Sequence, residues 1–320
     1  MTWTVFASAA ALVTAATASD IQPPKAFVPD LTDVAHEVID LEQERHHRLT
    51  VPVTVMGQGP YKFLIDTGSQ ATVLSTDLAD ALELHERETA TLVAMNSSRV
   101  VETTFVPELT VGSRTTFIRT APLLEGANIG GADGILGLDS LQDQRVVLDF
   151  ANWQILVAPA DELGGQNGYE IVVRARRELG QLIITQAKLD GVRTAVIIDT
   201  GAQGSIGNPA LLQRLRRARD LGLSSMTDVN GVELTGQVKF ARALSLGRAD
   251  LQNFALTFSD SPTFKHLGFG NKPALILGMS ELRSFDRVAI DFEERKVLFD
   301  VPRASRVPSA SSFRSYGNGS

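Results

Sequence analysis

The chain of 320 residues contains no cysteine, so disulfide bonds, thiolate zinc sites and a cysteine nucleophile are all excluded. Its five histidines form no His-Glu-x-x-His spacing, which is the usual signature of a zinc protease helix. The sequence also lacks a Gly-x-Ser-x-Gly serine elbow, a dinucleotide fingerprint and a P-loop. We therefore expect neither a metal nor another cofactor, and any hydrolytic chemistry must come from other side chains.

Positive charge is also scarce, since 30 Lys and Arg stand against 37 Asp and Glu and the formal net charge is −7. Nucleic-acid binding normally needs clustered basic residues, so we expect no nucleic-acid partner. One basic run does occur, and its spacing within residues 211–221 predicts a helix with a solvated face. The run comprises Arg214, Arg216, Arg217 and Arg219.

The N-terminus carries an apolar, alanine-rich stretch from Val5 to Ala16, followed by Thr17 and Ala18. A small-x-small triplet after a short apolar run is typical of a secretory signal peptide, here cleaved before Ser19. No lysine or arginine precedes the run, which leaves an uncleaved anchor or an unstructured leader as alternatives. The run is too short to span a membrane comfortably. We expect cleavage, export to the periplasm or outside the cell, and no stable membrane insertion afterwards.

What the sequence does contain is one motif that occurs twice. Phe63–Leu74 and Ala195–Ile206 each have an apolar run, then Asp-Thr-Gly, a small residue and Gln, and then apolar residues again. Apolar runs rich in Ile and Val are typical of buried strands. A strand that ends in Asp and Gly predicts a tight turn that holds the acid near the core. Because burying one unpaired acid is costly, we expect Asp66 and Asp199 to face each other.

The repeat continues beyond the acids. Gly134–Leu138 in the first half matches Leu275–Met279 in the second, and Arg145–Phe150 matches Arg287–Phe292. Both halves therefore carry the same ordered series of elements, which indicates two related structural units in one chain. In the last pair an aspartate follows each apolar run and precedes Phe, so a turn or capping role is expected for it rather than catalysis.

Asp-Thr-Gly followed by Ser or Ala, with a later apolar-apolar-Gly in each half, resembles the aspartic peptidases. The short halves, with Arg48–Val55 and Gly57–Gly68 leading into the first acid, are most similar to bacterial retropepsin-like proteases joined in tandem. Pepsin-like enzymes also carry both halves in one chain. The resemblance covers roughly residues 46–302. It implies an all-β, bilobal fold of two β-barrel-like lobes, with the active site in the cleft between them.

The resemblance and the composition together set the expected domain organisation. A polar, glycine-rich segment separates the halves, and the Ser/Arg/Gly-rich C-terminus has no apolar period, which predicts a disordered tail. Apolar spacing from Leu31 to Leu41 predicts a short helix on the first lobe. The expected parts are a signal peptide (1–18), an N-terminal segment (19–45), a first lobe (46–158), a linker (159–170), a second lobe (171–302) and the tail (303–320).

Two carboxyls that share one proton can hydrolyse a peptide bond without a metal or a covalent nucleophile. The ionised carboxyl takes a proton from water, and the protonated one hydrogen-bonds the substrate carbonyl and later assists the leaving amine. Asp66 and Asp199 are the candidates, and which of them holds the proton stays open. The predicted activity is that of an aspartic endopeptidase acting on exported proteins. Its substrate is an extended polypeptide and its working form a monomer.

The resemblance gives the residues next to the acids supporting roles in the active-site loops. The threonines bond across the lobe interface, and the glycines permit tight turns and a close approach of the backbone. Ser69 can donate to the outer oxygen of Asp66 and favour its ionised form, which Ala202 cannot do for Asp199. We therefore expect a pH optimum less acidic than that of a pepsin with hydroxyls on both sides. The supporting residues are Thr67, Gly68, Ser69, Thr200, Gly201 and Ala202.

Two segments carry hairpin signals. Residues 89–106 have β-prone runs around a polar tip, and the second half has an Asn-Gly pair, a strong two-residue turn. The resemblance places flaps, which are hairpins that fold over the substrate, at these positions; ordinary surface hairpins are the alternative. The candidate flap or substrate-binding residues are Asn96, Ser97, Ser98, Asn230 and Gly231.

Two other functions fit the same fold. A non-catalytic module would hold extended peptides by strand addition in the cleft. Such a module should have lost an acid, whereas both Asp-Thr-Gly motifs are intact. A single-lobe protease that must dimerise is disfavoured, because each half has its own acid. The sequence leaves open the substrate, the subsite preference, removal of a pro-segment and the oligomeric state.

Overall fold

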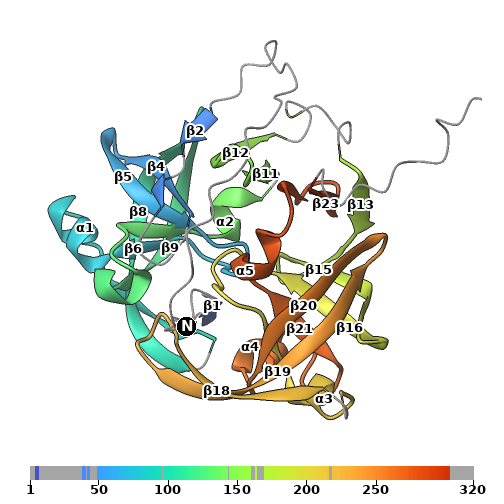
Figure 1. The fold of residues 1–320 in the computed structure, drawn as a ribbon. Helices are drawn as coiled ribbons and strands as arrows, with labels where there is room; N and C mark the ends of the chain where they lie inside the picture. The colour runs from blue at the N-terminus through green and yellow to red at the C-terminus, as the bar shows by residue number, and fades with distance from the viewer. Residues whose placement is uncertain are drawn as a thin grey trace, which may run out of the picture.

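The computed structural model describes residues 4–6, 38–40, 42–43, 49–95, 97–142, 144–159, 163, 169–215 and 218–302. These residues form two lobes of β-sheet that are joined by a third sheet, with only short helices between strands (Figure 1). The all-β, bilobal fold expected from the sequence is therefore confirmed.

The first lobe is built on a nine-stranded sheet in the order β1-β7-β8-β9-β6-β10-β5-β4-β3. Its inner strand β5 ends in a buried apolar run and pairs in parallel with β10, as expected for strands covered on both faces. Helix α1 begins after Ser75, whose side chain accepts a hydrogen bond from the Leu78 N–H at 3.1 Å. The elements are β1 Thr4–Phe6, β3 Glu42–Gln43, β4 Leu49–Val55, β5 Gln58–Ile65, β6 Val73–Ser75, α1 Thr76–Ala81, β7 Glu88–Val93, β8 Ser98–Val111, β9 Arg114–Leu124, η1 Gly126–Ile129, β10 Gly134–Leu136 and α2 Leu138–Leu141.

The second lobe repeats this plan in an eight-stranded sheet with the order β14-β15-β16-β21-β17-β20-β19-β18. Strand β16 pairs in parallel with β21, as β5 pairs with β10 in the first lobe. The repeated sequence thus forms repeated structure. The elements are β14 Arg176–Glu178, β15 Gln181–Leu189, β16 Val192–Ile198, β17 Ile206–Gly207, α3 Pro209–Leu212, β18 Arg219–Thr227, β19 Glu233–Leu246, β20 Ala249–Phe258, α4 Pro262–His266, β21 Ala274–Leu277 and α5 Met279–Leu282.

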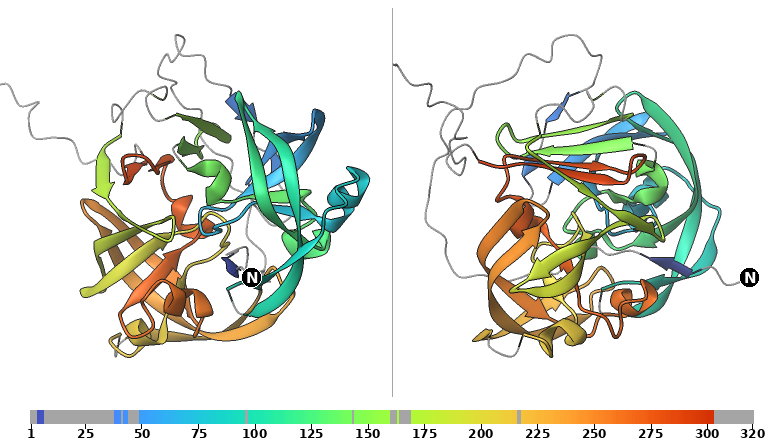
Figure 2. Two further views of the ribbon diagram at one scale, coloured as in Figure 1. Left: turned by 180° about the vertical axis from the view of Figure 1, so that it is seen from behind. Right: turned by 90° about the vertical axis from the view of Figure 1, so that its right-hand side faces the viewer.

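A six-stranded sheet joins the lobes, in the order β13-β23-β22-β11-β12-β2. It lies across one side of the molecule, where strands from both halves of the chain run together (Figure 2). At its centre β11 of the first half pairs antiparallel with β22 of the second. The elements are β2 Val38–Asp40, β11 Gln144–Asp149, β12 Gln154–Pro159, β13 Ile171–Arg174, β22 Arg287–Asp291 and β23 Lys296–Asp300.

The repeated aspartates of this sheet have structural roles, as expected. Asp149 accepts a hydrogen bond from the Asn152 N–H at 2.9 Å, and Asp291 accepts one from the Glu294 N–H at 2.7 Å, so each closes the turn after its strand. Asp291 also receives the guanidinium of the buried Arg145, at 2.5 Å and 3.0 Å. This buried ion pair links the two halves at their central contact.

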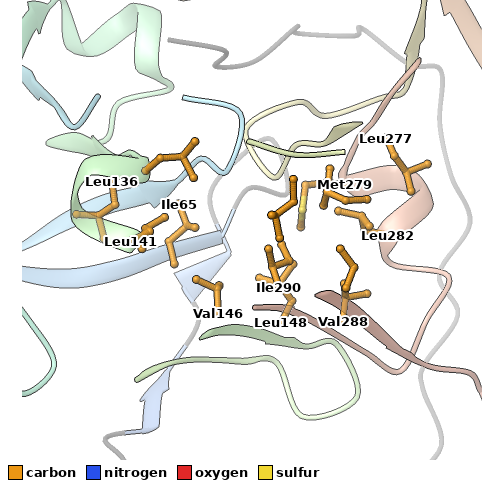
Figure 3. Close-up of a cluster of buried hydrophobic side chains, with 14 of the residues drawn as sticks. Ile65, Leu136, Leu141, Val146, Leu148, Leu277, Met279, Leu282, Val288 and Ile290 are labelled. Atoms are coloured by element: carbon orange, nitrogen blue, oxygen red, sulfur yellow. The ribbon is translucent and has the colours of Figure 1, made fainter. Parts of the chain in front are cut away.

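The hydrophobic core is continuous between the lobes (Figure 3). Side chains next to the first acid lie opposite side chains next to the second, and residues of the six-stranded sheet pack beside both groups. Burying each such side chain contributes about 1.5 to 3 kcal/mol. The core therefore holds the two acid-bearing strands in a fixed relation. The labelled residues are Ile65, Leu136, Leu141, Val146, Leu148, Leu277, Met279, Leu282, Val288 and Ile290.

Each lobe also extends a long hairpin toward the other lobe, on the side opposite the six-stranded sheet (Figure 1). The first is β7–β8 and the second is β18–β19. The edge of β7 that does not pair with β8 takes β1 as a parallel neighbour, with Thr4 opposite Thr91 and Phe6 opposite Val93. The hairpins predicted at these positions are thus present.

Two expectations about helices are wrong. Of the basic run, Arg214 lies beyond the end of α3 at Leu212 and Arg219 begins β18, while Arg216 and Arg217 lie outside the described residues. Pairing of β18 with the long strand β19 outweighs the local helix preference. Val38, expected on a helix, lies instead in β2, which pairs with β12. Most residues of the expected signal peptide, linker and tail, and Asn96 at the first hairpin tip, lie outside the described residues.

Candidate active site

Each lobe presents its acid at the end of an inner strand whose last residues are buried. Asp66 directly follows β5, and Asp199 directly follows β16. The N–H of Asp66 donates to the Leu136 carbonyl at 3.0 Å, and the N–H of Asp199 donates to the Leu277 carbonyl at 3.1 Å. Both acceptors are the last residues of the parallel neighbour strands. The two acids therefore occupy the same position in equivalent turns.

Within each turn, the acid folds back onto the backbone that follows it. Oδ1 of Asp66 accepts hydrogen bonds from the N–H groups of Gly68 at 2.8 Å and Ser69 at 2.9 Å. Oδ1 of Asp199 accepts the corresponding bonds from the second and third following residues, at 2.9 Å and 3.1 Å. One oxygen of each carboxyl is thus fixed by its own turn, which leaves the other to face outward from the turn.

The glycine of each turn lies against the acid of the other lobe. A side chain at Gly68 would collide with the carboxyl of Asp199, and a side chain at Gly201 would collide with the carboxyl of Asp66. Neither glycine needs a left-handed backbone here, so the requirement for glycine is the space itself. The reciprocal contact places the two carboxyls together at the lobe interface.

The two threonines interlock across that interface, as the resemblance implies. The Thr67 hydroxyl donates to the Ile198 carbonyl at 3.0 Å, and the Thr200 hydroxyl donates to the Ile65 carbonyl at 2.8 Å. Each hydroxyl also accepts the N–H of the other threonine, at 3.0 Å and 3.2 Å. Four buried hydrogen bonds thus connect the ends of β5 and β16, and each hydroxyl both donates and accepts across the interface.

The electrostatics of Asp66 point to a proton shared with its neighbour. Its Oδ2 is buried and has no hydrogen-bond donor in the described part of the chain. Burial raises the pKa of Asp66 well above its usual range, and the charge and hydrogen-bonding of Asp199 raise it further, while the N–H groups of Gly68 and Ser69 act in the opposite direction. A proton held between the two carboxyls would give Oδ2 its missing donor.

The expected role of Ser69 needs correction. Its hydroxyl hydrogen goes to the Ala71 carbonyl, at 2.8 Å, rather than to the outer oxygen of Asp66. Its backbone N–H, not its hydroxyl, is the group that binds the acid in the way described above. Ala202 plays the same backbone role for Asp199. The Oδ2 of Asp66 therefore gains no stabilisation of its ionised form from the Ser69 hydroxyl.

Sequence reasoning missed a contact from the second lobe to the first acid turn. The buried side chain of Gln181, at the start of β15, donates through Nε2 to the Gly68 carbonyl at 2.5 Å. Gln70 returns the contact by donating to the Leu179 carbonyl at 2.7 Å. A lone glutamine after a Gly turn gives no signal that could have marked it in the sequence.

The hairpin tips bring together some of the predicted flap residues. The Ser97 hydroxyl donates to Oδ2 of Asp228 at 2.6 Å, and the Asn230 side chain donates to the Ser97 hydroxyl at 2.8 Å. Oδ1 of Asp228 accepts the N–H groups of Asn230 and Val232, which shapes the second tip. Ser98 begins β8 and is exposed. Asp228 was not among the predicted flap residues, although an acid two positions before Asn-Gly is a recognisable turn signal.

Each tip also packs into the core of the opposite lobe. Met95 of the first hairpin lies in a buried cluster of second-lobe residues that includes Ile197 and Phe264. Its carbonyl accepts a hydrogen bond from the Ser261 hydroxyl. Val229 of the second hairpin lies in a buried cluster of first-lobe residues. Each hairpin tip thus packs against the opposite lobe. The acids are buried in this conformation, since Asp66 is 0% and Asp199 1% exposed.

The rest of the described chain adds little that competes with this site. None of its residues form a group of three or more His, Asp or Glu side chains able to hold a metal ion. No helix among them has the length and apolar content that crossing a membrane requires. A groove of about 930 Å³ lies on strands β7, β8 and β9, lined by residues such as Arg87, Phe105 and Phe117, and none of its lining residues contact the acids.

Comparison with known families agrees with this geometry. The model of the gag-polyprotein putative aspartyl protease family matches residues 51–143, and the model described as aspartyl protease matches residues 185–280. The first match includes Asp66 and the second includes Asp199, and together they cover more than half of the chain. No curated protein matches the chain. The chain therefore belongs to the aspartyl proteases, a group of peptide hydrolases, and carries two retropepsin-like domains in tandem.

Proposed function

We propose that the protein is an aspartic endopeptidase that cleaves internal peptide bonds of extended polypeptides, with water activated between Asp66 and Asp199. The observation that carries this proposal is the buried Oδ2 of Asp66, which has no donor among the described residues although a second carboxyl lies at the same interface. A shared proton satisfies that oxygen and creates one acid and one base in the same place.

The reaction follows from that division of roles. The ionised carboxylate takes a proton from water as the water oxygen attacks the substrate carbonyl carbon. The protonated carboxyl gives its proton to the carbonyl oxygen, which produces a neutral diol. The diol then returns a proton to one carboxylate while the other carboxyl protonates the nitrogen. The C–N bond breaks, and a carboxylic acid and an amine leave while the pair regains its single proton.

The hairpin edges support an extended substrate. An extended peptide can add as a strand to a sheet edge, where backbone bonds give affinity and side-chain pockets give specificity. The edge of β7 accepts the three residues Thr4–Phe6 in this way. A peptide that enters beneath the hairpins would meet the same kind of edge next to the acid turns.

Substrate entry must involve movement of the hairpins. Both acids are buried in this conformation, and the tips are held by contacts to the opposite lobes. Loop or hairpin closure over a reacting centre excludes water and completes the site. We therefore assign this conformation to the closed state of the enzyme and expect an open state during binding and release.

The proposed location is the periplasm or the outside of the cell, with exported polypeptides as substrates. This part of the proposal depends on the sequence alone, on the apolar stretch from Val5 to Ala16 and the small-x-small triplet that ends it. Mass spectrometry of the N-terminus of the protein recovered from a bacterial periplasm tests it. A new N-terminus at Ser19 is expected, and an N-terminus that remains at Met1 would contradict cleavage.

The second candidate is a peptide-binding module without turnover, and endoproteolysis separates the two. Wild type is incubated with a peptide whose termini are both blocked, and the products are identified by mass spectrometry. Internal cleavage that a pepstatin-type inhibitor abolishes is the expected result. A folded protein that binds the blocked peptide at about pH 3 to 8 without ever cutting it would support the module instead.

A further inference from the structure

Each lobe carries a second carboxyl close behind its acid turn, outside the reacting pair. In the second lobe this group is Glu281, the third residue of the short helix α5, which is 8% exposed. In the first lobe it is Asp139, the second residue of α2, which is more exposed. The mechanism proposed above uses neither of them. Both follow the repeated apolar-apolar-Gly motif, by two residues after Gly137 and three after Gly278.

In the second lobe, Glu281 holds the segment that follows Asp199. The Ser205 hydroxyl donates to Oε2 of Glu281 and accepts the Gly278 N–H at 3.1 Å. The N–H of Met279 donates to the Ala202 carbonyl at 2.8 Å. The end of the acid turn is therefore attached to the start of α5 through the Ser205 hydroxyl, through the backbone bond of Met279, and through the N–H and hydroxyl of Ser280, which both donate to the Gln203 carbonyl at 2.8 Å.

In the first lobe the same attachment is made from a neighbouring helix position. The Thr72 hydroxyl donates to Oδ1 of Asp139 at 2.6 Å and accepts the Gly137 N–H at 3.1 Å. The N–H of Leu138 donates to the Ser69 carbonyl at 2.8 Å. Thr72 and Ser205 both lie six residues after their acids. In both lobes a hydroxyl therefore lies between a carboxyl and a glycine N–H. The two carboxyls that take part do not occupy corresponding positions in the repeat.

We propose that Glu281 is a positioning residue for Asp199, acting through the Ser205 hydroxyl, and that Asp139 acts on Asp66 in the same way through Thr72. The carboxyl accepts the hydrogen of the hydroxyl group. A lone pair of the hydroxyl oxygen then faces the glycine N–H. This orientation fixes the segment behind the turn, and with it the direction in which the reacting carboxyl points. The effect on turnover rests on the proposed function.

Burial raises the pKa of both carboxyls. It raises the pKa of Glu281 to about 7, against the opposing effect of the Ser205 hydroxyl and of the N–H groups of Ser205 and Glu281 itself. No charged side chain in the described part of the chain contributes to this shift. The carboxyl therefore gains its charge near neutral pH. When protonated it can donate to Ser205, and the hydroxyl orientation is then no longer unique.

The test uses Glu281→Ala and Glu281→Gln, with Asp139→Ala as the matched variant in the other lobe. Hydrogen exchange is measured by mass spectrometry on the segments 199–205 and 66–72, and kcat and KM are measured across about pH 4 to 9. Glu281→Ala should speed exchange in 199–205 but not in 66–72, and Asp139→Ala should do the reverse. Glu281→Ala should lower kcat by about tenfold to a hundredfold with little change in KM, because small misplacements of reacting groups are costly.

Glu281→Gln keeps an acceptor oxygen for the Ser205 hydroxyl but cannot ionise. It therefore keeps the proposal testable if Glu281→Ala fails to fold. It should remove a step near pH 7 from the pH profile of kcat and leave the fold intact. The proposal would be overturned if both Glu281 variants kept the kcat, the pH profile and the hydrogen exchange of wild type. Faster exchange in both lobes after either alanine substitution would also overturn it. If wild type itself never cleaves, the proposed function fails, and lobe-specific exchange still decides the positioning role.

Discussion

The Ser97 hydroxyl donates to the carboxyl of Asp228 at 2.6 Å, which joins the tip of one lobe's hairpin to the tip of the other's. The two residues are 131 positions apart in the chain. Around this bond, each tip buries an apolar residue in the opposite lobe. Separation of the hairpin tips would break this hydrogen bond and expose the side chains of Met95 and Val229. Several separate contacts therefore favour the closed state.

Weakening that bond should favour opening. Ser97→Ala removes the hydroxyl and leaves Asp228 with its backbone donors, at a cost to the closed state of about 1 to 2 kcal/mol. Hydrogen exchange of the tip residues 94–98 should become faster, and kcat/KM should rise severalfold if hairpin opening limits substrate capture. The control is Ser225→Ala, which removes an exposed hydroxyl contact within one hairpin. Equal exchange at the tips of wild type and Ser97→Ala would show that the bond does not hold the closed state.

Replacing the interlocking threonines should reduce both stability and turnover. Thr67→Val preserves the shape of the side chain but leaves the Ile198 carbonyl and the Thr200 N–H without their partner. Each buried unpaired group costs about 1 to 3 kcal/mol, so the free energy of unfolding should fall by about 2 to 4 kcal/mol. Denaturant titration measures this fall, and kcat should fall with it.

Thr194→Val is the control for that prediction. Thr194 is also buried in β16, but its hydroxyl bonds to the Val192 carbonyl within its own strand. The control should lose stability without a matching loss of kcat. If both variants reduce kcat to the same extent, the interlock has no special role in aligning the acids.

The stability of the fold should decline toward neutral pH because of Glu281. Its pKa is raised by burial to about 7 from an ordinary 4.5, so the folded state holds the proton more tightly than the unfolded state. The resulting stabilisation, about 3 kcal/mol, is fully present below about pH 4.5 and is lost as the pH rises through about 7. Chemical denaturation at a series of pH values should show this slope in wild type. A slope of the same size in Glu281→Gln would assign it to other groups.

The pH profile of cleavage should peak at mildly acidic rather than strongly acidic pH. Burial and the neighbouring acid raise the pKa of Asp66, and no donor in the described residues stabilises the ionised form of its Oδ2. The pair therefore retains its single proton to higher pH than a pair whose outer oxygens accept hydroxyl bonds. Initial rates on a blocked peptide measure the profile. A maximum at about pH 2 to 3 would contradict this account of the pair.

Much of the arrangement around the acids was predictable from the sequence, because it repeats. Two copies of Asp-Thr-Gly after apolar runs indicate two equivalent turns, and a buried acid needs a partner, which predicts that Asp66 and Asp199 meet. The roles of the glycine and threonine in each turn, close approach to the opposite acid and bonding across the interface, follow from the same meeting of the two turns. The glycines that recur in both halves after the apolar pairs, Gly137 and Gly278, each lie against the backbone behind the acid turn of their lobe.

The parts that could not be predicted depend on contacts between residues distant in sequence. The direction of the Ser69 hydroxyl depends on where the Ala71 carbonyl lies, which no local pattern specifies. Arg219 was expected on a helix but lies in β18, because pairing with β19 overrides a local helix preference. The exchange of Met95 and Val229 between lobes requires knowing how the two hairpins meet. Each of these outcomes is decided by tertiary structure.

The most direct test of the account removes each acid of the pair in turn. Asp66→Asn and Asp199→Asn are compared with wild type, and Asp77→Asn serves as a control at an exposed acid of helix α1. Cleavage of an unfolded protein is followed at about pH 3 to 8, and circular dichroism shows that each variant is folded. Both pair variants should lose at least about a thousandfold in kcat while the control matches wild type. Substantial cleavage by either folded pair variant would contradict hydrolysis between Asp66 and Asp199.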